Sequence, residues 1–284
     1  MAELILSAFS DEYADGFTEQ LAAMKRLGID YIELRFVNKK NVAALTGEEA
    51  ETVRRQLTDA GIKVSAIGSP LGKVAIDGDW QAHLDQTKRI CETACRLDSG
   101  FVRMFSFYLP EGEAPERYRN QVIDRLGQML DIADNYGVTF GHENEARIYG
   151  DSPERCLDLL ESFQGRLRCV FDMGNFVLEG HDPHPKAFER LKPYLGWFHI
   201  KDALRAGTIV PAGKGEACIS QILRDYRETG SGSVFVTLEP HLQTFSGLNA
   251  QVGKSFETPY QFENQQVAFE EALRCLKEVL TEIR

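Results

Sequence analysis

Residues 115–143, PERYRNQVIDRLGQMLDIADNYGVTFGHE, contain the unit from which this chain is built. A charged, amphipathic stretch begins at a proline and runs to Tyr136, and Gly137 separates it from the short apolar run 138–143. A glycine after a helix supplies the left-handed backbone that closes the last turn. A β-branched and aromatic run directly after it indicates a strand. The stretch therefore predicts a helix, a glycine and a strand in immediate succession.

The same unit recurs along the chain at intervals of 28 to 39 residues, around Gly28, Gly61, Gly100, Gly137, Gly165, Gly196 and Gly232. We expect eight strands, at residues 4–9, 31–35, 63–67, 101–107, 138–143, 167–172, 196–201 and 234–239. The expected helices lie at 16–27, 47–60, 80–97, 115–136, 152–164, 185–194, 217–229 and 264–282. Strict alternation requires parallel strands, because parallel neighbours need a crossover helix. Eight such units predict an α/β fold, a single-domain (β/α)8 barrel over residues 1–284.

An open, doubly wound sheet is the rival architecture. It would carry a glycine-rich turn after its first strand, and residues 7–12, SAFSDE, contain no glycine. Two long connections are also predicted, at 174–185 and at 241–263. The second contains Phe245, Phe256, Tyr260 and Phe262. Because a long aromatic loop in a compact domain is usually a packed lid, we expect a lid at 241–263.

Composition restricts the partners. The chain has 284 residues, with 32 Lys and Arg against 43 Asp and Glu, for a net charge of −11. Such a charge repels phosphate backbones and anionic lipid, so we expect no nucleic acid and no membrane as partner. Six cysteines occur without a Cys-x-x-Cys pair. Scattered thiols fit a reducing compartment, and no signal or membrane segment is evident, so we expect a cytoplasmic protein.

Ionisable residues end four consecutive expected strands: Glu143, Asp172, His199 and Glu239. The carboxyl ends of barrel strands meet at one mouth, which brings these side chains together. Buried carboxylates are costly unless they are paired, protonated or bound to metal. Three carboxylates and one imidazole suit Mn²⁺, Mg²⁺ or Co²⁺. The alternative, which stays open here, is that these acids pair across the barrel with Arg35, Arg103 and Lys201.

Five short segments carry a family resemblance: HEN at 142–144, FDMGN at 171–175, HIKD at 199–202, GKGE at 213–216 and LEP at 238–240. With the eight repeated units, they make the chain resemble the xylose isomerase-like TIM barrel superfamily, in its branch of sugar isomerases and epimerases. The resemblance implies one divalent metal, Mn²⁺ before Mg²⁺, Co²⁺ or Zn²⁺, on Glu143, Asp172, His199 and Glu239. It also implies a small sugar or keto-sugar substrate and leaves a homo-oligomer open.

The resemblance further implies that Glu143 and Glu239 act as acid and base. For substrate contacts we expect Lys201, His241, Asn175, Glu145 and Arg103. Many relatives have histidine at the positions of Glu145 and Asn175, so the substrate is less constrained than the metal. For Lys201, an ion pair with Asp202 or Glu145 is the structural alternative.

A metal held by carboxylates polarises a carbonyl and acidifies the adjacent C–H, and a nearby carboxylate can remove that proton. We therefore expect a metal-dependent isomerase or epimerase that acts through an enediolate. A lyase or deglycosidase acting on 3-keto glycosides begins with the same step and is the alternative. An abasic-site endonuclease and a non-catalytic sugar-binding barrel are disfavoured, the first by the charge and the small number of histidines, the second by the intact ligand set.

Overall fold

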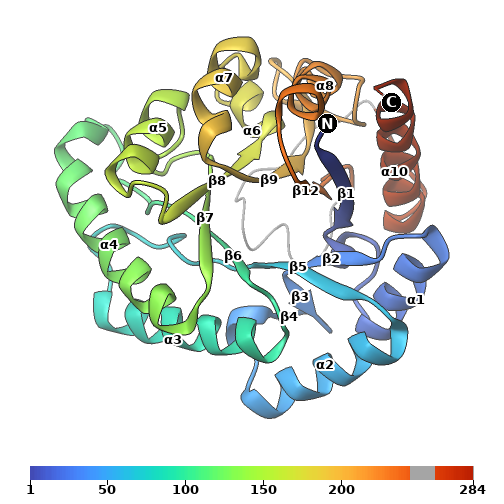
Figure 1. Cartoon of the computed structure of the whole chain (residues 1–284), viewed down its shortest axis with the longest axis horizontal. Helices are drawn as coiled ribbons and strands as arrows, with labels where there is room; N and C mark the ends of the chain where they lie inside the picture. Colours follow the sequence, from blue (N-terminus) through green and yellow to red (C-terminus); the bar gives the residue numbers. More distant parts are fainter. Residues whose placement is uncertain (244–259, 284) are drawn as a thin grey trace.

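The computed structural model of the chain describes residues 1–243 and 260–283. Eight parallel strands close into a barrel in the order β1-β12-β9-β8-β7-β6-β5-β2, with the helices outside it (Figure 1). This is the expected single-domain (β/α)8 barrel. The strands are β1 (Glu3–Ala8), β2 (Tyr31–Leu34), β5 (Lys63–Gly68), β6 (Phe101–Met104), β7 (Thr139–Glu143), β8 (Leu167–Asp172), β9 (Leu195–Ile200) and β12 (Ser233–Leu238).

Helices of very different length connect the strands: α1 (Phe17–Leu27), α2 (Gly47–Ala60), α3 (Trp80–Arg96), α4 (Arg119–Tyr136), α5 (Pro153–Ser162), α6 (Met173–Leu178), α7 (Phe188–Leu191), α8 (Ile219–Thr229) and α10 (Gln265–Glu282). Short helical turns are found at Ser10–Glu12, Val42–Ala44, Pro115–Tyr118, Pro183–Ala187 and Lys192–Tyr194. Two hairpins project from the strand ends, β3 (Phe36–Val37) with β4 (Lys40–Asn41), and β10 (Asp202–Leu204) with β11 (Thr208–Val210).

The helix–glycine–strand unit is confirmed where a helix precedes the strand directly. Gly61 and Gly137 close α2 and α4 in the left-handed conformation, at φ 69° and 66°. Gly196 is different, because it lies within β9, where the side chain of Arg168 and the backbone of Cys169 approach it closely. At this position the glycine provides space for its neighbours, and it closes no helix.

Two sequence predictions need correction. The expected strand 101–107 ends at Met104, and Phe107 turns the chain away with φ 68°. The expected loop 174–185 begins with α6, which covers residues 174–178 of it, and ends in the helical turn Pro183–Ala187. The expected helix 185–194 is confirmed as helical, in three short pieces: the end of the turn Pro183–Ala187, then α7, then the turn Lys192–Tyr194. Most of the expected lid, residues 244–259, lies outside the described residues.

The inside of the barrel is layered because alternate residues of each strand point inward. Phe101 and Trp197 form part of an apolar floor, with ring centroids 5.6 Å apart. Two residues further along the same strands, Arg103 and His199 belong to a polar layer, and both are buried. A layer of charged side chains at the carboxyl ends of the strands therefore packs on an apolar layer deeper in the barrel.

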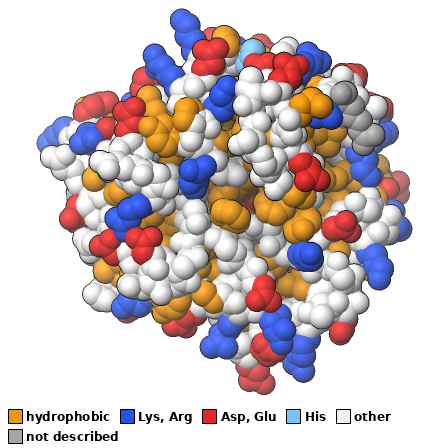
Figure 2. Space-filling view, viewed as in Figure 1, with side chains coloured by type: hydrophobic (Ala, Val, Ile, Leu, Met, Phe, Trp, Pro, Cys, Tyr) orange, Lys and Arg blue, Asp and Glu red, His pale blue; other side chains and the backbone are white. Residues whose placement is uncertain are grey.

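The outer surface mixes both signs of charge. Seen from the same direction, Lys and Arg alternate with Asp and Glu around the edge of the molecule, and hydrophobic side chains gather toward its middle (Figure 2). Among the described helices, none is long and apolar enough to cross a bilayer.

Candidate metal centre

The four residues that end the consecutive strands come together in the polar layer. Glu143 and Asp172 are the last residues of β7 and β8, His199 lies near the end of β9, and Glu239 follows β12 directly. Each offers a ligand atom, and these four atoms all lie within 4.8 Å of one another. All four side chains are buried. These four residues lie close together because they occupy equivalent positions, at or near the carboxyl ends of adjacent parallel strands.

His199 Nδ1 marks the centre of this group. It lies 3.1 Å from Glu143 Oε1 and 3.4 Å from Glu239 Oε2. It is nevertheless buried without a hydrogen-bond partner among the described residues. A cation bound about 2.0–2.2 Å from each ligand would hold opposite ligands no more than about 4.4 Å apart. The four ligand atoms would therefore bind a divalent metal if their largest separations shortened by a few tenths of an ångström.

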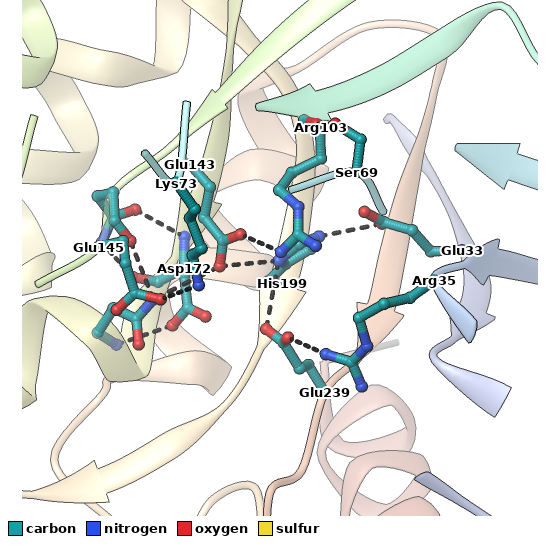
Figure 3. A network of polar contacts seen from close by, with 12 residues as sticks. Glu33, Arg35, Ser69, Lys73, Arg103, Glu143, Glu145, Asp172, His199 and Glu239 are labelled. Carbon is teal, nitrogen blue, oxygen red and sulfur yellow. Dashed lines mark hydrogen bonds and ion pairs between the residues drawn. The ribbon is translucent and has the colours of Figure 1, made fainter. Parts of the chain in front are cut away.

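The buried acids also form the ion pairs with arginine that the sequence left open as the alternative to a metal. Arg103 Nη1 donates to Glu143 Oε2 at 2.7 Å, and Arg35 Nη1 donates to Glu239 Oε1 at 2.9 Å. Figure 3 shows the guanidinium of Arg103 pointing at Glu143 and that of Arg35 pointing at Glu239. In each glutamate, one oxygen is held by arginine and the other faces His199. The arginines orient the glutamates and leave the oxygens at the centre of the group facing the imidazole.

Lys201 also lies inside the ligand group. Its ammonium donates to Asp172 Oδ2 at 2.8 Å, to Glu239 Oε2 at 3.2 Å and to Asn175 Oδ1 at 3.1 Å. The alternative, in which Lys201 pairs with Asp202 or Glu145, is therefore wrong, because its hydrogen bonds go to Asp172, Glu239 and Asn175. Although burial lowers it, the pKa of Lys201 is raised overall because Asp172 and Glu239 face the ammonium.

Many ionisable side chains meet in this layer. Seven carboxyl groups surround the centre, those of Asp11, Glu12, Glu33, Glu143, Glu145, Asp172 and Glu239, together with the cationic side chains of Arg35, Lys73, Arg103 and Lys201. Burial raises the pKa of Glu12 to about 8. Burial raises the pKa of Asp172 to about 7. The nearby Glu143 and Glu239 also raise this pKa, whereas Lys201 lowers it. A divalent cation would offset this repulsion.

The two glutamates remain ionised. Burial alone would raise the pKa of Glu143, but His199 and Arg103 lower it below its usual range. Lys201 and His241 likewise overcome burial and lower the pKa of Glu239. Two ionised carboxylates, one at the end of β7 and one after β12, therefore flank Asp172 and His199.

The remaining expected substrate contacts occupy different places. Asn175 donates to the Asn144 carbonyl at 2.9 Å and lies 3.4 Å from Glu143 Oε1. Glu145 accepts from Lys73 at 2.9 Å, at the edge of the ligand group. The His241 imidazole lies 3.4 Å from Glu239 Oε1 and from Glu12 Oε1. Arg103 pairs with Glu143, which makes it a neighbour of the ligand group.

Several residues of the centre were not singled out from the sequence. Asn144 exchanges two hydrogen bonds with the backbone of Asp172 and so joins the ends of β7 and β8. Asp11 and Glu12 hold the guanidinium of Arg35. Two adjacent acids directly after the first strand were the available signal for this pair.

The glycine-rich segment 213–216 does not present free backbone donors. Asp202 Oδ2 accepts from the backbone N–H groups of Gly213 and Gly215, and Oδ1 accepts from Ala217. In a phosphate-binding loop such groups face the ligand. Here a carboxylate of the same chain satisfies them and fastens the segment to β10.

The family model described as xylose isomerase-like TIM barrel matches residues 21–279. The chain belongs to this family. No curated protein matches the sequence of this xylose isomerase-like barrel.

Solved structures with the same fold are distant in sequence. A D-allulose 3-epimerase from Methylomonas sp. is 14% identical, with all of both chains covered and a TM-score of 0.76. The IOLI protein with a bound zinc atom is 17% identical, with 99% of both chains covered and a TM-score of 0.76. The 3-keto-D-glucoside 4-epimerase YcjR from E. coli is 15% identical over 98% of this chain and 100% of that one, with a TM-score of 0.72. At this identity the likeness shows a shared fold.

Proposed function

We propose that this xylose isomerase-like barrel is a metal-dependent isomerase or epimerase that moves a proton beside the carbonyl of a sugar or keto-sugar. The observation that carries the proposal is the group of four ligand atoms within 4.8 Å, two of which belong to ionised glutamates. Glu143, Asp172, His199 and Glu239 would hold one divalent ion, with Mn²⁺ our first choice for this oxygen-rich set. When bound, the ion polarises the substrate carbonyl and so acidifies the neighbouring C–H.

The protein side chains then move the proton. Glu143 and Glu239 stand on β7 and after β12, with β8 and β9 between them in the barrel. A proton taken by one glutamate and returned by the other would reach the opposite face of the carbon, which is epimerisation. Return to the adjacent carbon is isomerisation. Arg103 and Arg35 fix the orientation of the two carboxylates. Lys201 would donate to a substrate oxygen by exchanging one of its longer bonds, to Glu239 or to Asn175.

The test is hydrogen exchange. The protein is incubated with Mn²⁺ in deuterated water with a panel of ketoses and 3-keto glycosides, and deuterium is located by NMR. We expect incorporation at a carbon next to the carbonyl, and its loss when a chelator is added. Glu239→Gln should slow exchange by about 10²–10⁴-fold, the usual contribution of a general base. Asp158→Asn also replaces a carboxylate by an amide, but on α5 outside the barrel, and should leave the exchange rate unaltered.

Two results would change the assignment. Exchange at the wild-type rate in Glu239→Gln, or in the presence of chelator, would contradict the proposed chemistry. Release of an aglycone or an unsaturated product from a 3-keto glycoside would identify the alternative, elimination after the same proton abstraction. In that case the roles of Glu143 and Glu239 in proton removal would stand, and the reaction class would be a lyase.

A further inference from the structure

Glu33 is a carboxylate at the centre of the barrel. It lies on β2 and is fully buried. A buried carboxylate is costly unless donors satisfy it. Its Oε2 accepts from two side chains of β9, from Trp197 Nε1 at 3.1 Å and from His199 Nε2 at 3.0 Å. Glu33 is therefore tied directly to one of the four proposed metal ligands.

The His199 ring bridges Glu33 and the ligand group, as Figure 3 shows. One ring nitrogen, Nε2, contacts Glu33, and the other, Nδ1, lies 3.1 Å from Glu143 Oε1. The edge-to-face contact with Phe9, with ring centroids 5.2 Å apart and planes at 81°, restrains the plane of the imidazole. The ring thus has one orientation, with its two nitrogens assigned to different partners.

The chemistry of the partners decides which nitrogen carries hydrogen. An ionised carboxylate only accepts hydrogen bonds, so the nitrogen that faces Glu33 must donate. An imidazole that binds a metal has one N–H, so with Nε2–H directed at Glu33 the lone pair of Nδ1 would face the ion between Glu143 and Glu239. Without an ion, Glu33 and Glu143 raise the pKa of His199 above its usual range although burial lowers it. The indole N–H of Trp197 donates to the same Oε2 and holds the Glu33 carboxylate in place. In metal sites, a carboxylate behind a histidine ligand fixes the tautomer and raises the affinity for the ion.

We propose that Glu33 is a positioning residue that fixes His199 with Nε2 protonated and presents Nδ1 as the metal ligand. This inference rests on the proposed function, because it assigns a role toward the metal of the same site. Glu33 acts through His199 and has no part in proton transfer to substrate.

The test compares Glu33→Gln, Glu33→Leu and wild type by competition for Zn²⁺ with a fluorescent chelator. We expect Glu33→Leu to bind Zn²⁺ about 10- to 100-fold more weakly. Glu33→Gln keeps an acceptor for Nε2–H, so its loss should be smaller. Ser65→Ala, which removes the Ser7–Ser65 hydrogen bond in the same barrel interior, is the control and should retain wild-type affinity.

Nitrogen NMR of the Zn²⁺-loaded protein labelled at histidine provides a readout that a purely structural role would not change. In wild type and Glu33→Gln, His199 should give a metal-bound Nδ1 and a protonated Nε2. In Glu33→Leu this pattern should be lost or mixed. Wild-type Zn²⁺ affinity in Glu33→Leu, or a zinc-bound Nε2 in wild type, would overturn the inference alone. Failure of the wild-type protein to bind Zn²⁺, Mn²⁺ or Mg²⁺ would overturn the proposed function together with it.

Discussion

Replacing Lys201 with methionine removes a buried ammonium from between two of the proposed metal ligands. Lys201 is 3% exposed, and its Nζ bonds to carboxylates of both Asp172 and Glu239. Breaking a buried ion pair from one side costs about 3–5 kcal/mol, because the remaining charge is left buried without its partner. We expect the metal-free K201M variant to lose an unfolding free energy of this size.

A divalent metal should reverse part of that loss. Two unit charges 4 Å apart interact by about 4 kcal/mol at an effective dielectric constant of 20, so removing the ammonium removes a substantial repulsion on an incoming cation. We expect K201M to bind Mn²⁺ at least about tenfold more tightly, which corresponds to about 1.4 kcal/mol. At the same saturating Mn²⁺ concentration, a tenfold lower Kd stabilises the folded variant by about 1.4 kcal/mol more than wild type. The difference in unfolding free energy between the variant and wild type should therefore narrow by about that amount.

The assay is urea unfolding followed by circular dichroism, with a chelator and again with saturating Mn²⁺. Lys73→Met is the matched control, since Lys73 forms its ion pair with Glu145, which is not one of the four proposed ligands. It should be less destabilising, and Mn²⁺ should not affect it preferentially. Wild-type stability of metal-free K201M, or a gap that widens with Mn²⁺, would refute the reasoning.

Three further predictions concern other polar side chains of the protein. The guanidinium of Arg35 occupies a second group of possible ligands that includes Glu12, so Arg35→Met should raise the Mn²⁺ content from one to two per chain by elemental analysis; a ratio that stays at one would contradict this. Asp202→Ala should cost at least about 2 kcal/mol by urea unfolding, because buried N–H groups lose their acceptor. Burial lowers the pKa of His83 from 6.5 to about 4. Below pH 6.5 the unfolded chain therefore gains a proton that the folded protein does not, and stability should fall as the pH drops toward 4. His83→Phe should show a shallower fall over this window, and an equal slope would exclude His83 as its source.

Local sequence patterns were sufficient to predict the barrel and to predict that Glu143, Asp172, His199 and Glu239 meet inside it. Each strand of the barrel had its own apolar run, and each central acid or histidine followed such a run. Since strand parity and parallel topology are set locally, Glu143, Asp172, His199 and Glu239 could be expected at one height. Local patterns were less exact at the ends of elements, as in 101–107, where the expected strand stops at Met104.

The partners of those four residues depended on tertiary structure. The hydrogen bonds of Glu33 to His199 and of Arg35 to Glu239 join residues 166 and 204 positions apart. Inward alternation could indicate that Glu33, Arg35 and Arg103 face the lumen. It could not indicate whether Arg103 turns to Glu143 or elsewhere, because many inward residues compete for each partner.

By itself, the sequence determined the kind of barrel, the strands that end in ionisable residues and the excess of negative charge. The closed barrel decided which oxygen of each glutamate faces an arginine and which faces His199, and which imidazole nitrogen points at Glu33. The physical reason is that strand order and alternation depend on near neighbours in the chain. Hydrogen-bond partners and protonation depend instead on distances of about 3 Å between side chains of different strands, and these exist only after the barrel closes.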